Sequence, residues 1–114
     1  MGESQTDNQR VLAYLKKHRD DMLADLVRLV NMESPTDEKA AVDALGTQLL
    51  IMLQDLGADV DVLQQEKTGD HLVARWGSGD GGLLLLTHMD TVWELGTLAK
   101  RPVRVEGDRV YAPG

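Results

Sequence analysis

The chain has 114 residues and a formal net charge of −7; this is the length of one domain, and the acidic balance argues against nucleic acid as a partner. It contains no cysteine, which excludes disulfides, thiolate metal sites and cysteine nucleophiles, so any metal must be held by His, Asp or Glu. No apolar run is long enough to span a bilayer and the first ten residues show no secretory signal, so we expect a cytoplasmic protein without membrane contact.

Two helices are predicted in the first half of the chain. Apolar residues recur at steps of three and four from about Asn8 to Val30, which indicates an amphipathic helix. Ser34 and Pro35 then read as the N-cap and the first residue of a second helix. Its apolar stripe runs over 42–56, and Gly57 is placed to end it in the left-handed conformation.

Strands follow from residue 58 onward. Val60 and Val62 alternate with aspartates, as in a half-buried strand, and 71–76 reads as the strand that returns beside it. The uninterrupted run Leu83–Leu86 predicts a strand buried on both faces. Residues 102–105 and 109–111 flank a plausible hairpin turn. Helices followed by strands predict an α/β fold with a layered mixed sheet.

Polar groups appear abruptly where the leucine run stops. His88 and Asp90 are two residues apart, so both point to the same side if strand geometry persists. A neutral imidazole can bind Zn²⁺, and a nearby carboxylate can orient the ring. The spacing alone is also compatible with a structural role, in which His88 caps the sheet and Asp90 starts a turn.

Three longer blocks around this pair resemble one family of metallopeptidases. They run from Leu83 through His88 and Asp90 to Trp93, from Gly96 to Pro102, and from Glu106 to Gly114, and a fourth block, Leu26 to Thr36, extends the likeness upstream. Together they are similar to the co-catalytic zinc peptidases of the glutamate carboxypeptidase, acetylornithine deacetylase and aminoacylase type.

The resemblance implies roles for two residues. His88 matches a ligand of one of two zinc ions, and Asp90 matches the catalytic aspartate that orients this histidine. It further implies that residues 1–114 form the N-terminal part of the catalytic domain. The bridging aspartate, the glutamate pair, the remaining ligands and a lid domain used for dimerisation would lie outside this sequence, so the chain alone is expected to be inactive.

The function implied is hydrolysis of an amide bond, with a small peptide or an N-acyl amino acid as substrate. Carboxypeptidase action on a C-terminal glutamate-like residue is the first expectation and deacylation of an N-acyl amino acid the second. A non-catalytic folding or interaction fragment is the alternative of another class. We expect the isolated chain to form a homodimer or otherwise associate through an exposed sheet edge, to aggregate, or to be only marginally folded.

Other residues are candidates for either a functional or a structural role. The basic cluster Lys100, Arg101 and Arg104 is either a solvated loop edge or a contact for a substrate carboxylate. Trp93 and Leu95 either line a substrate pocket or cover the end of the sheet. The two remaining histidines read as structural: His71 in a surface turn that opens a strand, and His18 partly buried on the first helix.

Overall fold

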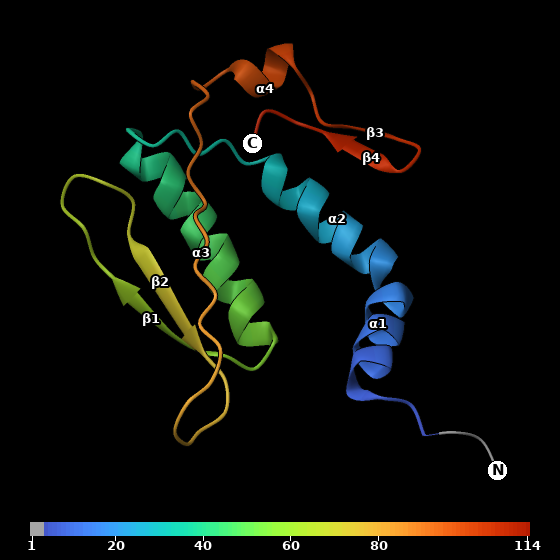
Figure 1. Ribbon diagram of the computed structural model, residues 1–114. Helices are drawn as coiled ribbons and strands as arrows, with labels where there is room; N and C mark the ends of the chain where they lie inside the picture. Colours follow the sequence, from blue (N-terminus) through green and yellow to red (C-terminus); the bar gives the residue numbers. More distant parts are fainter. Residues whose placement is uncertain (1–3) are drawn as a thin grey trace.

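The computed structural model describes residues 4–114, with its three longer helices in the first half of the chain (Figure 1). The first predicted helix is present but divided into α1 (Asp7–Lys17) and α2 (Arg19–Val30) at His18. Lysines end α1 and aspartates begin α2, and both charge patterns favour a helix end between them. The His18 side chain is half-buried, as predicted, with its ring 4.3 Å from that of Tyr14.

The second helix, α3 (Lys39–Asp55), begins later than the sequence predicts. Its N-cap is Glu38, so the assignment of Ser34 and Pro35 to the helix start is wrong. Ser34 is 1% exposed, and its hydroxyl donates a hydrogen bond to a carbonyl 55 residues away rather than to the next turn. The C-terminal prediction is confirmed, because Gly57 follows the C-cap with φ of 85°.

A hairpin packs against α3. Strands β1 (Asp59–Leu63) and β2 (His71–Arg75) pair antiparallel with Val60 opposite Ala74, which confirms the prediction. Gly69, before β2, lies so close to Val42 of α3 that no side chain fits between them. An ion-pair cluster ties the same region to the start of α3, with Lys39 Nζ 2.8 Å from Asp70 Oδ1 and 2.9 Å from Asp43 Oδ2.

The last third of the chain holds a second, separate hairpin. The short helix α4 (Thr97–Lys100) precedes β3 (Arg104–Glu106) and β4 (Arg109–Tyr111), which pair antiparallel as predicted. The turn between them contains Gly107 at φ 60°, a conformation that glycine adopts without steric cost. The α/β class is confirmed, and the strands lie in two two-stranded sheets.

The leucine run departs from its prediction. Leu83–Leu86 forms no strand, and these side chains are 80–96% exposed. Within residues 4–114 the segment has no partner strand, so its backbone cannot enter a hydrogen-bonded ladder. The prediction of a doubly buried strand is therefore wrong for these residues taken alone.

The core within residues 4–114 is small. The buried apolar side chains are Val42 and Leu45, both on α3. The radius of gyration is 17.2 Å, against about 13 Å for a compact domain of roughly 100 residues. In the described part of the chain no helix is long and apolar enough to cross a membrane.

Candidate functional site

The segment that carries the candidate site residues is held by the linker between α2 and α3. Thr91 N–H donates to Ser34 O over 2.8 Å, and Thr36 N–H donates to Thr91 O over 3.0 Å. The Ser34 hydroxyl adds a bond of 2.7 Å to Met89 O, and Pro35 and Thr91 form an isolated parallel bridge. This linker, rather than a sheet, positions residues 88–91.

His88 and Asp90 lie together as their spacing predicts. His88 Nδ1 is 3.3 Å from Asp90 Oδ1 and 3.0 Å from the Asp90 carbonyl oxygen. The imidazole is 83% exposed, whereas the carboxylate is 35% exposed. Because Nδ1 faces Asp90, a proton on that nitrogen leaves Nε2 as a free electron-pair donor.

Asp90 is fixed from its other side by Thr36. The Thr36 hydroxyl donates to Asp90 Oδ2 over 2.7 Å, and this bond holds the pKa of the Asp90 carboxyl below its usual range. The carboxylate is therefore ionised at neutral pH, with one oxygen toward Thr36 and the other toward His88. The arrangement suits a residue that orients an imidazole.

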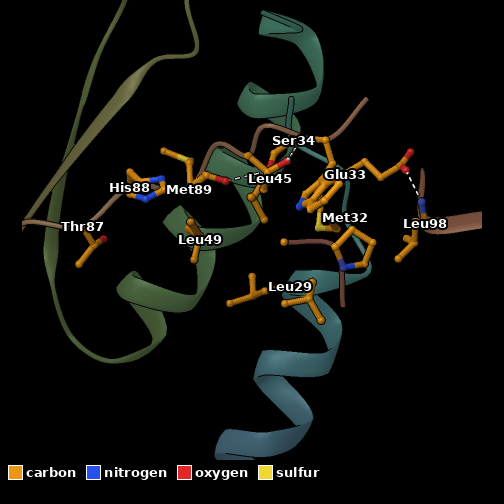
Figure 2. A pocket seen from close by; sticks show the side chains of 15 residues that line it. Leu29, Met32, Glu33, Ser34, Leu45, Leu49, Thr87, His88, Met89 and Leu98 are labelled. Carbon is orange, nitrogen blue, oxygen red and sulfur yellow. Dashed lines mark hydrogen bonds between the residues drawn. The ribbon is translucent and has the colours of Figure 1, made fainter. Parts of the chain in front are cut away.

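A cavity of about 250 Å³ opens beside His88, which is one of the residues that line it. Figure 2 shows His88 and Met89 beside Leu45 and Leu49 of α3, with Leu29 of α2 also lining the cavity. Trp93 is among the residues that line the cavity. Leu95 is 54% exposed and is not among the residues that line it.

The basic cluster is dispersed. The Arg101 guanidinium lies 4.7 Å from the centre of the Trp93 ring, at one side of the cavity. Arg104 stacks on Tyr111 and forms an ion pair with Glu106. Arg104 thus belongs to the β3–β4 hairpin, whereas Arg101 stacks on a side chain that lines the cavity.

Glu33 is a supporting residue that the sequence did not reveal. Its carboxylate accepts the N–H groups of Gly96 over 3.0 Å and of Leu98 over 2.8 Å, and these bonds lower its pKa. It thereby caps the start of α4 and closes one wall of the cavity (Figure 2). The available signal for Glu33, Ser34 and Thr36 was a polar block in the linker between two apolar helices.

The amino-acid sequence was compared with those of known proteins. No family model matches the chain. It is 41% identical over 96 residues to carboxypeptidase G2 from Pseudomonas sp. (strain RS-16), a match that covers 82% of this chain and 23% of that protein. The chain belongs to the carboxypeptidase and acetylornithine deacetylase family.

Acetylornithine deacetylases match a shorter stretch. The enzyme from Aliivibrio fischeri (strain MJ11) is 51% identical over 39 residues, and that from Vibrio parahaemolyticus is 44% identical over 45 residues. These matches cover 34% and 40% of this chain. The chain spans less than a quarter of the length of each of these relatives.

Side chains able to bind a metal are not clustered in the described residues. No group of three or more His, Cys, Asp or Glu side chains able to hold a metal occurs among residues 4–114. The other two histidines stand apart from the pair, His71 at the start of β2 and His18 at the α1–α2 junction beside Asp21. What the described residues offer to a metal is one exposed imidazole oriented by a carboxylate, which is the usual pairing at zinc sites.

Proposed function

We propose that this chain contributes the metal-binding histidine His88 and the orienting aspartate Asp90 to the active site of a zinc-dependent amide hydrolase. The observation that carries the proposal is the 3.3 Å contact between His88 Nδ1 and Asp90 Oδ1, in a chain 41% identical to carboxypeptidase G2. Asp90 would hold the ring so that Nε2 faces the metal, and Thr36 would hold Asp90.

Bound zinc would supply Lewis-acid activation of the scissile carbonyl and of water. Two ions would be held in the complete site, with the further ligands and the carboxylate that moves the proton contributed by residues outside this sequence. The task of this chain's residues is to bind and orient. The open side of His88 and the adjoining cavity leave room for the rest of the site.

Release of a C-terminal amino acid from a small peptide is the activity we favour. The match to carboxypeptidase G2 extends over 96 residues, more than twice the length of the matches to acetylornithine deacetylases. Deacylation of an N-acyl amino acid is the second candidate, supported by the higher identity of 51% within the shorter match.

A chimera tests the proposal. The matched segment of carboxypeptidase G2 is replaced by this chain, and the purified chimera is assayed for zinc content and for hydrolysis of an N-acyl-glutamate and of N-acetylornithine. We expect about two zinc ions per chain and faster turnover of the glutamate substrate. Asp90→Asn should lower zinc affinity or activity by about 10- to 100-fold, and His88→Ala by more.

His71→Ala is the matched control, because this exposed histidine lies on the hairpin away from the site. It should leave zinc content and turnover unchanged. Full zinc loading in the His88→Ala chimera would contradict the ligand assignment. A folded chimera that binds no zinc and hydrolyses neither substrate would favour a non-catalytic role, and preference for N-acetylornithine would favour the deacylase.

A further inference from the structure

Residues 92–95 form a loop that is held at both ends by the linker between α2 and α3. Before the loop, the linker holds Thr91 through backbone hydrogen bonds. After the loop, the Glu33 carboxylate accepts the N–H groups of Gly96 over 3.0 Å and of Leu98 over 2.8 Å, and Figure 2 shows the second of these bonds. One short stretch of chain therefore fixes where the 92–95 loop begins and where it ends.

The 92–95 loop borders the His88–Asp90 pair. A second cavity, of about 380 Å³, is lined by both members of the pair and, from the loop, by Val92 and Trp93. Val92 is 89% exposed and Trp93 is 41% exposed. Loops that a rigid scaffold holds in place are common carriers of binding residues. This loop offers apolar side chains to a molecule that occupies the space beside the pair.

Glu33 is chemically suited to fix the far end of the loop. Its carboxylate is ionised at neutral pH, because the two N–H groups lower its pKa. Hydrogen bonds to an ionised acceptor are stronger than those between neutral groups. Gly96, which donates one of these bonds, has φ of 91°, a left-handed conformation that favours glycine.

The short helix α4 connects this anchor to the Trp93 ring. Arg101, the C-cap residue of α4, donates its backbone N–H to Thr97 O over 2.8 Å. Its guanidinium lies 4.7 Å from the centre of the Trp93 ring, an attractive cation–π contact. Glu33 therefore acts on Trp93 by two routes, through the loop that joins them and through the helix whose start it caps.

We propose that Glu33 is a positioning residue of the active site, which fixes the 92–95 loop so that its apolar side chains contact the apolar part of the substrate. The inference rests on the proposed function. Because the hydrogen bonds of Glu33 go to Gly96 and Leu98, its loss should loosen the contact with the substrate and leave zinc binding intact. Thr36 differs, because it bonds directly to the aspartate that orients the metal-binding histidine.

Kinetics of the carboxypeptidase G2 chimera test the assignment. Glu33→Gln keeps the size of the side chain but replaces one acceptor oxygen by an amino group that faces an N–H donor. We expect it to raise KM for the preferred substrate about 10-fold and to leave kcat and zinc content within about twofold, because a loosened wall weakens binding without touching the reacting groups. Glu38→Gln is the matched control, an exposed glutamate at the start of α3 whose side chain makes no capping bond, and it should leave KM unchanged.

Trp93→Ala supplies a second test in the same chimera. It should also raise KM, and Glu33→Gln should add little in its presence, because residues that act as a unit are not additive. Effects on KM that multiply independently would overturn the inference. An unchanged KM in Glu33→Gln, or loss of its zinc, would overturn it as well.

Hydrogen exchange in the 114-residue chain gives a measurement that does not depend on activity. The Leu98 amide should exchange faster in Glu33→Gln, whereas the Thr91 amide, which donates to Ser34 O, should keep its rate. An equal rate at Leu98 in the two proteins would overturn the inference. A folded chimera without zinc or activity would count against the proposed function, and exchange at Leu98 would then decide whether Glu33 fixes the loop.

Discussion

The β1–β2 hairpin and the leucine run follow each other in the chain, but only the hairpin forms paired strands. In the hairpin, valines alternate with aspartates, the two strands pair with each other, and the buried Val42 of α3 packs against Gly69 in their connection. In Leu83–Leu86 nothing alternates, no strand of residues 4–114 pairs with it, and its side chains remain exposed.

The difference shows what each kind of strand requires. An amphipathic hairpin needs one partner, which a short connection supplies, and one cover, here a helix that directly precedes it. A strand that is apolar on both faces needs neighbours on both edges and cover on both faces, all from distant parts of a fold. Residues 4–114 supply the partner and the cover that the hairpin needs. They do not supply the neighbouring strands that the leucine run needs.

The contact between Gly69 and Val42 is the place where the hairpin is most easily disrupted. A Cβ at Gly69 would lie 2.2 Å from Val42 Cγ1, and Val42 is 4% exposed. We expect Gly69→Ala to destabilise the chain by about 1–3 kcal/mol, because the buried valine or the turn must shift. Thermal unfolding followed by circular dichroism measures the effect.

Gly46→Ala is its control. Gly46 lies inside α3, and the nearest atom to an added Cβ is Met89 Sδ at 3.7 Å, an ordinary contact. Alanine should stabilise this helix by about 0.5–1 kcal/mol. Equal destabilisation by the two substitutions would show that close packing at Gly69 is not what secures the hairpin.

Ser34→Ala sharpens the comparison at the other end of the leucine run. Residues 89–91 are held by the linker, and loss of the buried hydroxyl should cost about 1 kcal/mol. We expect faster hydrogen exchange at the Thr91 amide, which donates to Ser34 O. Thr47→Ala removes an exposed hydroxyl bonded to Asp43 O on α3 and should leave this rate unchanged.

The smallest expected effect concerns the ion pairs that join the hairpin to α3. The Lys39 ammonium lowers the pKa of the Asp70 and Asp43 carboxyls, and these carboxylates raise the pKa of Lys39. The carboxylate contribution to stability is complete above their unfolded pKa of about 4 and is lost as pH falls through the lower folded values. The ammonium contribution is lost above about pH 10, as pH rises through its raised folded value.

Lys39→Met should therefore flatten the acid side of the stability curve. We expect the melting temperature of the native chain to fall more between pH 5 and pH 2 than that of the variant, and the difference to shrink in high salt. Glu33 and Asp90, whose pKa values are also lowered, titrate in both proteins and cancel from the comparison. If the melting temperatures of the two proteins fall in parallel with pH, the ion-pair cluster makes no measurable contribution to stability.

Local patterns predicted much of the secondary structure. The alternation at Val60 and Val62, the turn at Gly107 and the helix end at Gly57 each depend on residues within a few positions, and each is confirmed. His88 and Asp90 are in contact, although the prediction that both face one side assumed a strand that this segment does not form. Their roles at a metal stay a proposal.

The wrong predictions have non-local causes. Ser34 has the composition of a helix cap, but its hydroxyl bonds to Met89 O and its carbonyl accepts the Thr91 amide. The leucine run has the composition of an inner strand, but strand pairing needs neighbours that these residues lack. A local pattern states what a segment can form and carries no information about whether a distant partner is there.

By itself, the sequence determined where most helices and strands lie and which family the chain resembles. Only the tertiary structure decided that Ser34 and Thr36 hold residues 89–91, that Glu33 caps α4, and that Trp93 lines a cavity. The reason is physical. Helix and strand periodicity arises from bonds between near neighbours, whereas these contacts join groups more than 50 residues apart, or depend on such contacts.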